Sequence, residues 1–289
     1  MIHTHSSLDK LIGNRLAEIL SRLDVRSSIV IEENFNSVYQ ALQQDVPDVL
    51  IVIGANFNRK FLKAKKIKST LLTCFIEQNG TLSQSGKEQK IEGIDLVYRD
   101  LPMMADERVQ EYVGNPLMDY IKAVKTPAEV GTTNVQLTII YNRRQKNFIH
   151  QLSRRLHNAF TDMKIHVVTT DSELEKSIQK IGDSSVVVAF DNQSELLSLE
   201  LNCPTIRINS RRIFRKRNEF SLLNFLAKEN VIQVFQTNQV DQVQNEITRV
   251  IQDHNYCAGI MGDFQVLKSR IGNQPTLRLI AHAVIETVG

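Results

Sequence analysis

The stretch that decides the fold is NVQLTIIYNRRQKNFIHQLSRRLHNAF, residues 134–160. It begins with a short apolar run, NVQLTIIY, which predicts a buried strand. Apolar residues then recur at helical spacing, and five of them are predicted to share one face of a long helix: Phe148, Ile149, Leu152, Leu156 and Phe160. A strand followed directly by such a helix is typical of a sheet that is covered by helices.

The same alternation continues on both sides of this stretch. Downstream, the runs 164–170, 184–190 and 204–208 predict strands, and 172–181 and 192–201 predict helices. Upstream, the runs 48–54, 70–76, 94–98 and 110–114 predict strands, and the basic segment 58–68 predicts a helix. Strands that are apolar on both faces and alternate with helices indicate parallel sheets covered on two sides.

The boundary between the two runs is a polar segment that carries Pro127 and Gly131. We therefore predict a Rossmann-like N-terminal domain over 1–121, a linker over 122–133, and a second Rossmann-like domain over 134–289. We predict that the first domain is a shortened (reduced) Rossmann-like domain, because too few residues precede His5 to form a full first strand. The tail from Val240 onward is rich in helical spacing, with breaks near Tyr256 and at residues 272–275. Two such domains facing each other would form a cleft, with ligands at the carboxyl ends of the strands.

Composition limits the class of protein. The chain has 289 residues, of which 42% are hydrophobic and 23% charged, as in globular proteins. Its three cysteines form no CxxC pair, and its histidines have no ligand spacing, so we expect no disulfide framework, no metal site and a reducing cytoplasm. No secretory signal is recognisable, and no apolar run approaches the roughly 20 residues of a membrane span. The net charge of +3 is too small to indicate nucleic acid.

Two local motifs need their own explanation. In YVGNPLMDYI, residues 112–121, the triplet Gly114, Asn115 and Pro116 predicts a sharp bend, either a plain turn or a hinge at the end of the first domain. The run RRIFRKRN, residues 211–218, is either a solvated face or a contact for an anionic surface. Its charged members are Arg211, Arg212, Arg215, Lys216 and Arg217.

Four segments, in order along the chain, resemble one family, the lipid A disaccharide synthases. They are PDVLIVIGANFN (47–58), LPMMADERVQEYVGNPLMD (101–119), EFSLLNFLAKENVIQVFQ (219–236) and RIGNQPTLRLIAHAVIE (270–286). The resemblance implies a glycosyltransferase of the GT-B type, which transfers a diacylglucosamine unit from a UDP-sugar to a lipid-linked glucosamine phosphate. It also implies a donor nucleotide held by the second domain, no metal or other cofactor, and peripheral attachment to the inner face of the cytoplasmic membrane, an anionic lipid surface.

The residues of the family's sites are only partly present. Gly54 and Asn56 stand where the family has carboxylates. In the first loop of the second domain Arg144 is retained, and we expect Asn142 and Arg144 to contact a diphosphate, although a solvated arginine is the plain alternative. The family's glycine-rich loop corresponds to residues 191–197, where Asn192 or Ser194 would cap a helix and leave its N–H groups free. The other expected nucleotide contacts, which are otherwise polar loop residues bonding to the backbone, are Asn224, Gln233 and Gln236.

Losing a catalytic base and a phosphate loop slows a transferase by roughly a hundredfold or more per group. The sequence therefore leaves three functions open. The first is a lipid A disaccharide synthase with weakened or altered catalysis. The second is a non-catalytic GT-B protein that binds a UDP-sugar, a lipid precursor, a partner protein or another copy of itself. The third is a peripheral module that binds anions through residues 211–217.

Overall fold

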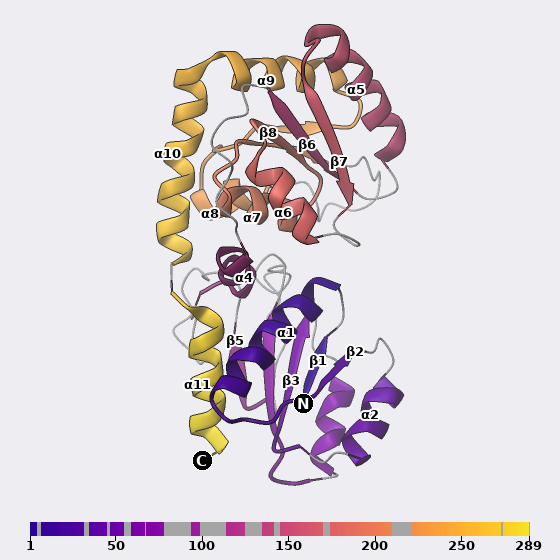
Figure 1. The fold of residues 1–289 in the computed structure, drawn as a ribbon, viewed down its shortest axis with the longest axis vertical. Coiled ribbons are helices and arrows are strands. Elements are labelled where there is room, and N and C mark those ends of the chain that lie inside the picture. The colour runs from indigo at the N-terminus through magenta and orange to yellow at the C-terminus, as the bar shows by residue number, and fades with distance from the viewer. Residues whose placement is uncertain are drawn as a thin grey trace. The chain divides into compact units, whose positions relative to one another are not determined.

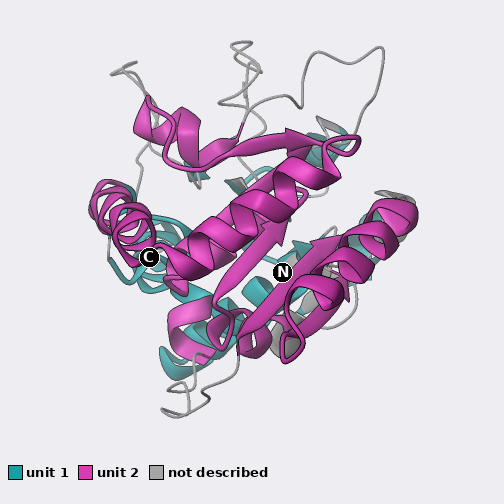
Figure 2. Ribbon diagram, turned by 90° about the horizontal axis from the view of Figure 1, so that it is seen from above, with its two compact units in different colours: residues 1–120, 271–289 teal, residues 121–270 magenta. Residues whose placement is uncertain are grey.

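The computed structural model describes residues 1–4, 7–31, 35–44, 47–54, 59–66, 68–77, 94–98, 114–124, 135–141, 145–169, 174–209, 221–272 and 274–288. The chain divides into two compact units (Figures 1 and 2). Unit 1 contains residues 1–120 and 271–289, and unit 2 contains residues 121–270. Among the described residues, no helix is long and apolar enough to cross a membrane.

Unit 1 is built on a parallel sheet of five strands in the order β2-β1-β3-β4-β5. The helices α1 and α2 and the 3-10 helix η1 surround this sheet, and α11, from the far end of the chain, packs on α1. The strands are β1 (Ile2–Thr4), β2 (Ile29–Ile31), β3 (Val49–Gly54), β4 (Leu72–Glu77) and β5 (Leu96–Tyr98). The helices are α1 (Ser7–Arg22), α2 (Phe35–Gln44), η1 (Arg59–Lys66), the start of α4 (Pro116–Val124) and α11 (Thr276–Val288).

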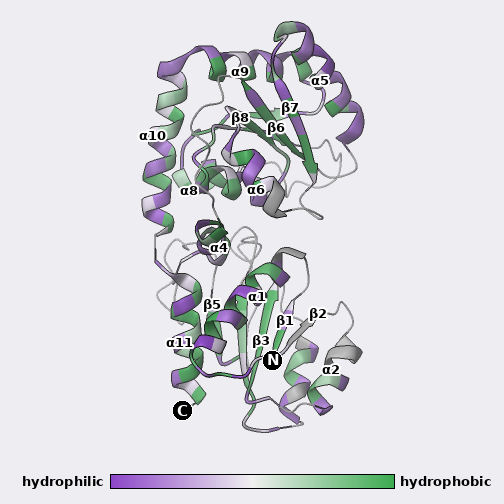
Figure 3. Cartoon of the chain, in the orientation of Figure 1, coloured by the Kyte–Doolittle hydropathy of each residue, from purple (hydrophilic) through white to green (hydrophobic). Residues whose placement is uncertain are grey.

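Both faces of this sheet are buried, as the apolar strand pattern predicts. On one face, Leu50 and Val52 of β3 pack with Leu42 of α2 and Phe61 of η1. On the other face α1 approaches closely, because a Cβ on Gly13 would lie 3.0 Å from Thr4 Cγ2. Strand β3 in the middle of this sheet is green in Figure 3, which agrees with its burial.

Unit 2 repeats the architecture with a five-stranded parallel sheet in the order β10-β9-β8-β6-β7. Its strand β8 is fully buried, from Val186 to Ala189. The other strands are β6 (Gln136–Tyr141), β7 (Lys164–Thr169), β9 (Thr205–Asn209) and β10 (Val234–Gln236). The helices are α5 (Lys146–Ala159), α6 (Leu174–Gly182), α7 (Asn192–Glu200), α8 (Leu222–Ala227), α9 (Val240–Gln252) and α10 (His254–Ile271).

Most predicted elements are confirmed within one to three residues of their bounds, including β3, β4, β6, β7, β8, α5 and α7. The predicted helix at 58–68 is a 3-10 helix over Arg59–Lys66 instead. The strand predicted at 110–114 lies outside the described residues except for Gly114, which is not in a strand. We expected no full strand before His5, and Ile2–Thr4 form only a short strand of three residues, which nevertheless pairs with both β2 and β3.

The compact units differ from the predicted domain bounds in the last helix and in the linker. We placed the terminal helices in the second domain, but α11 groups with unit 1. The physical reason is its apolar face, since Leu277, Ile280 and Val284 are buried. Of the predicted linker, residues 122–124 are the last turn of α4, and the remainder lies outside the described residues.

The triplet Gly114, Asn115 and Pro116 begins α4. Asn115 is the capping residue, because its Oδ1 accepts a hydrogen bond from the backbone N–H of Met118 at 3.1 Å, and Pro116 occupies the first helical position. Gly114 has φ +115°, and a Cβ there would collide with Thr276 Oγ1 of α11. Asp119 Oδ2 in turn accepts from the N–H of Leu277 at 3.0 Å. The starts of α4 and α11 are therefore joined within unit 1.

Candidate functional site

The strand order of unit 2 reverses between β6 and β8, which makes this position the candidate for a ligand site. Numbered along the unit, its strands run 2-1-3-4-5, so the chain leaves β6 toward β7 on one side and leaves β8 toward β9 on the other. Ligands of open α/β sheets bind beyond the carboxyl ends of the strands at this reversal. Phe148 in the first turn of α5 and Phe190 after β8 meet edge to face, with ring centroids 5.7 Å apart. The first turn of α5 and the end of β8 are therefore adjacent.

The start of α5 has neither a side-chain cap nor a nearby acid among the described residues. Its N-terminal capping residue, Gln145, makes no capping hydrogen bond with its side chain, and the first turn of α5 contains no acidic residue. Gln145 is only 6% exposed, and its Oε1 has no hydrogen-bond partner. The first N–H groups of a helix lack partners within the helix and carry a partial positive charge. An anion is the ligand that these groups favour.

The start of α7, on the other side of the reversal, is already occupied by a carboxylate. Asp191 Oδ1 accepts hydrogen bonds from the N–H and the Oγ of Ser194, at 2.8 and 2.7 Å. Ser194 is fully buried, so it holds the loop rather than facing solvent. Asn192 is partly exposed, and Gln193 has a buried Nε2 without a partner. The helix cap expected here is thus formed by Asp191, and its negative charge disfavours a second anion.

The start of α8 is held by a buried ion pair. Glu195 Oε2 accepts from Ser221 Oγ and from the N–H of Leu223, both at 2.9 Å, while Glu195 Oε1 lies 3.1 Å from Arg207 NH1. Burial raises the pKa of Glu195, and the charge of Arg207 opposes this rise. The carboxylate is therefore committed to fixing α8 and β9. Among the helix starts whose caps are described, α7 is capped by Asp191, and α8 is capped by Ser221 with Glu195 beside it. The starts of α5 and α9 have no side-chain cap, and of these two only α9 has an acid, Asp241, in its first turn.

The remaining predicted nucleotide contacts of unit 2 lie apart from one another. The side-chain amide of Asn224 bonds to backbone groups, accepting from the N–H of Val231 and Ile232 and donating to the Ile232 carbonyl, each at 2.9 Å. Gln236 ends β10 at the carboxyl edge of the sheet. Gln233 precedes β10, at the opposite edge. Asn192 thus lies at the reversal between β6 and β8. Gln236 lies two strands away from it, on β10, and Gln233 lies at the other end of β10, apart from both residues.

Several predicted site residues lie outside the described part of the chain. They are Asn56, Asn142, Arg144, Arg211, Arg212, Arg215, Lys216 and Arg217. By sequence, Asn142 and Arg144 belong to the three residues that separate β6 from Gln145. Gly54 is described, and it ends β3 as a buried residue at the carboxyl edge of the first sheet.

Sequence reasoning missed a carboxylate in unit 1. The first sheet has the same strand order, and its reversal falls between β1 and β3. Asp9 lies in the first turn of α1, directly after β1, and is only 3% exposed. Among the described side chains of unit 1, it is the one buried carboxylate. The signal was hidden because β1, with His3 and Thr4 in its three residues, gives no apolar run that predicts a strand.

The described residues hold no group of three or more His, Cys, Asp or Glu side chains able to bind a metal ion. Cys74, Cys203 and Cys257 are all free thiols. Burial raises the pKa of the Cys74 and Cys203 thiols, which makes them poor nucleophiles.

No protein-family model matches the chain, and no curated protein matches it in sequence. Solved structures do match in fold. The S. aureus MnaA structure with UDP has a TM-score of 0.68 at 11% identity, covering 99% of this chain and 96% of that one. The UDP-GlcNAc 2-epimerase from Neisseria meningitidis bound to UDP-GlcNAc has a TM-score of 0.65 at 9% identity, covering 99% and 98%.

A trehalose-6-phosphate synthase, studied for glycosyl transfer with retention, matches with a TM-score of 0.50 at 8% identity, covering 94% of this chain and 82% of that one. At such low identities the likeness shows the fold alone. The predicted fold class is confirmed: the chain is an α/β protein with a GT-B-like fold, two parallel sheets covered by helices and a helical C-terminal region.

Proposed function

We propose that unit 2 binds a UDP-sugar, with the diphosphate at the start of α5 between β6 and β8. The observation that carries the proposal is the contrast between helix starts, because α5 has no acidic cap while α7 and α8 are closed by Asp191 and Glu195. Structures of the same fold contain UDP or UDP-GlcNAc. This likeness supports a uridine nucleotide as the ligand of the reversal.

The proposed roles follow from position along the chain. The N–H groups of the first turn of α5 bind phosphate oxygens, and Arg144 with Asn142, one to three residues earlier, adds charge and a donor. Asn192 and the buried amides of Gln145 and Gln193 line the two sides of the reversal. Ser194 and Asn224 act as positioning residues that hold the neighbouring loops. Gln236 and Gln233 lie farther along the sheet.

The resemblance to lipid A disaccharide synthases supplies the finer proposal for the sugar, a diacylglucosamine donor that is used near an anionic lipid surface. Transfer to an acceptor hydroxyl requires a general base. At the end of β3 the chain offers Gly54 followed by Ala55, Asn56, Phe57 and Asn58, none of which is a carboxylate. We therefore propose that the protein binds the UDP-sugar but, lacking a base at the end of β3, transfers the sugar very slowly or not at all.

Asp9 favours a second candidate, a transferase that uses a different base. Its buried carboxylate lies at the start of α1, on the edge of the first sheet where an acceptor would bind by the same topological rule. In this candidate Asp9 removes the proton of the acceptor hydroxyl while the sugar leaves UDP.

Calorimetric titration of UDP into the wild type and Gln145→Asp tests the binding site. The new carboxylate caps α5 and repels the diphosphate, so UDP affinity should fall by about tenfold, or 1.4 kcal/mol, while the helix is stabilised. The matched control is Gln239→Asp at the start of α9, another glutamine without a capping hydrogen bond of its side chain. The control should bind UDP as the wild type does. Equal UDP affinity in both variants and the wild type would refute the site.

Measurement of UDP release from UDP-diacylglucosamine, with and without the lipid-linked acceptor, separates the two candidates. A binding protein shows UDP affinity without acceptor-dependent release. A transferase shows release that Asp9→Asn reduces by roughly a hundredfold or more, with UDP affinity unchanged. If millimolar UDP neither binds nor raises the melting temperature, both candidates fail.

A further inference from the structure

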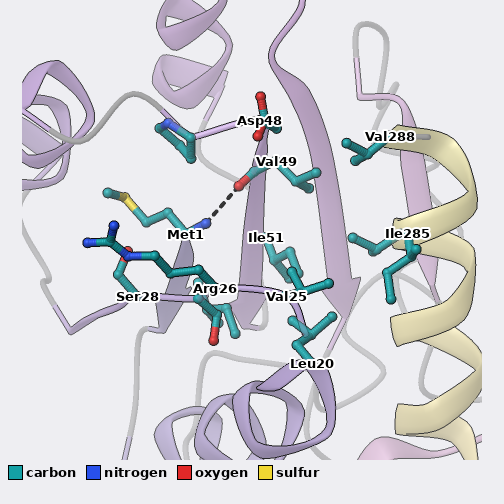
Figure 4. A pocket seen from close by; sticks show the side chains of 14 residues that line it. Met1, Leu20, Val25, Arg26, Ser28, Asp48, Val49, Ile51, Ile285 and Val288 are labelled. Atoms are coloured by element: carbon teal, nitrogen blue, oxygen red, sulfur yellow. Dashed lines mark hydrogen bonds between the residues drawn. The ribbon is translucent and has the colours of Figure 1, made fainter. Parts of the chain in front are cut away.

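Unit 1 contains an open cavity of about 400 Å³ (Figure 4). It lies at the end of the sheet where the strands begin, opposite to their carboxyl ends. It is lined by the beginnings of β1 and β3, by the connection from α1 to β2, and by the last turns of α11. Binding cavities for small molecules in proteins are typically about 300–1,000 Å³ in volume. The space is therefore large enough for a ligand and distinct from both strand reversals.

The cavity has an apolar end and a polar end. Figure 4 shows the side chains of Leu20, Val25, Ile51, Ile285 and Val288 around the space between α11 and β3. Arg26 and Ser28 lie at the other end, on the side away from α11. Val288 is 47% exposed, so the apolar end is reachable from solvent.

The charge at the rim favours an anion. Arg26 is exposed and forms no ion pair within the described part of the chain. The carboxylate on the rim, Asp48, is already engaged, because Lys68 Nζ donates to its Oδ1 and lowers its pKa. The hydroxyl groups of Ser27 and Ser28, next to Arg26, add donors for oxygen atoms of a ligand.

We propose that this cavity binds a small amphipathic carboxylate, such as a medium-chain fatty acid. The carboxylate pairs with the Arg26 guanidinium, and the alkyl chain lies against Leu20, Val25, Ile285 and Val288. An apolar wall next to the Arg26 guanidinium is complementary to a ligand with one charged end, and the α-ammonium of Met1, which also lines the cavity and donates to the Val49 carbonyl, adds positive charge there. The site goes beyond the proposed nucleotide function and does not depend on it.

Calorimetric titration of the full chain with octanoate, decanoate and decanol, below micelle-forming concentrations, tests the proposal. Decanoate should bind roughly fifteenfold more tightly than octanoate, about fourfold for each additional buried methylene group. Decanol, which lacks the charge, should bind more weakly than decanoate. Arg26→Gln should weaken decanoate by about tenfold and leave decanol unchanged.

Two further variants make the outcome decisive. Arg22→Gln removes a nearby exposed arginine that does not line the cavity, and it should bind decanoate as the wild type does. Ile285→Trp fills the apolar end and should abolish binding of both amphiphiles, while UDP affinity stays unchanged in every variant. Equal affinity of the wild type for decanol and decanoate, full affinity in Arg26→Gln, or full affinity in Ile285→Trp would each overturn the proposal.

Discussion

Gly114 is held in a conformation that other residues rarely adopt. Its φ of +115° and the contact with Thr276 both disfavour a Cβ, so Gly114→Ala should destabilise unit 1 by more than about 1 kcal/mol. Urea unfolding measures this loss. Adding Thr276→Ala should restore part of it, because the colliding hydroxyl is then absent. Gly262→Ala on α10 is the control of opposite sign, since a Cβ added at Gly262 would meet no neighbouring atom within 4 Å and alanine favours a helix by up to about 1 kcal/mol.

His166 on β7 should make unit 2 less stable in acid. Burial is the main cause that lowers the pKa of His166, Lys180 and Lys164 lower it further, and Asp183 opposes them. Because the pKa is lower in the folded than in the unfolded chain, the stabilising contribution is present above about pH 6.5 and is lost as the pH falls through the folded value. The free energy of unfolding should thus fall less between about pH 7.5 and about pH 5 in His166→Gln than in the wild type.

Urea titrations at the two pH values measure this difference, with His282→Gln, at an exposed position on α11, as the control that should behave like the wild type. An unchanged pH dependence in His166→Gln would show that the His166 side chain does not couple protonation to folding.

The helix α11 should contribute a large share of the stability of unit 1. Ile280 is fully buried, and Ile280→Ala is expected to lower the free energy of unfolding by about 2–5 kcal/mol. Leu279, the preceding residue, is 37% exposed, and Leu279→Ala should change the free energy of unfolding by less than about 0.5 kcal/mol. Chemical denaturation of the two variants makes the comparison. Similar small effects would mean that α11 is only loosely docked.

Sequence patterns predicted the strands whose two faces are both buried. The runs around Ile51, Cys74 and Val187 are continuous and apolar, so their period and length identify them. β1 and β2 were missed because each has only three residues, and β1 contains His3 and Thr4. The helix at 59–66 was predicted as helical, but apolar spacing does not separate a 3-10 helix from an α-helix over two turns.

The candidate site was less predictable than the fold. The contact of Glu195 with Ser221 and Leu223 joins residues 26 and 28 positions apart, so it exists only once the sheet has formed. The choice of Asp191 rather than Asn192 as the cap of α7 depends on where the helix begins, which propensities fix only within one or two residues. Asn224 was assigned to the nucleotide by resemblance, whereas the plain alternative, bonding to loop backbone, describes its contacts.

Unit 2 should fold and bind UDP without unit 1, whereas unit 1 should need both ends of the chain to fold. Unit 2 is one contiguous stretch, residues 121–270, whereas unit 1 needs residues from both ends of the chain. The segment 121–270 produced alone should therefore fold and bind UDP, and the segment 1–120 should not reach a cooperative fold without α11. Circular dichroism and calorimetric titration of each segment check both statements. A cooperatively folded 1–120 would show that α11 is dispensable.

The placement of α11 also has a consequence for biosynthesis. Domains usually fold in the order in which the ribosome releases them, at about 5–20 residues per second. Unit 1 lacks its last helix, α11, until residues 121–270 have been made, which is a delay of roughly 10–30 s. During that delay the apolar residues of α1 that α11 later covers are exposed on the nascent chain. We therefore expect unit 2 to fold before unit 1. We also expect chaperones to bind unit 1 during translation.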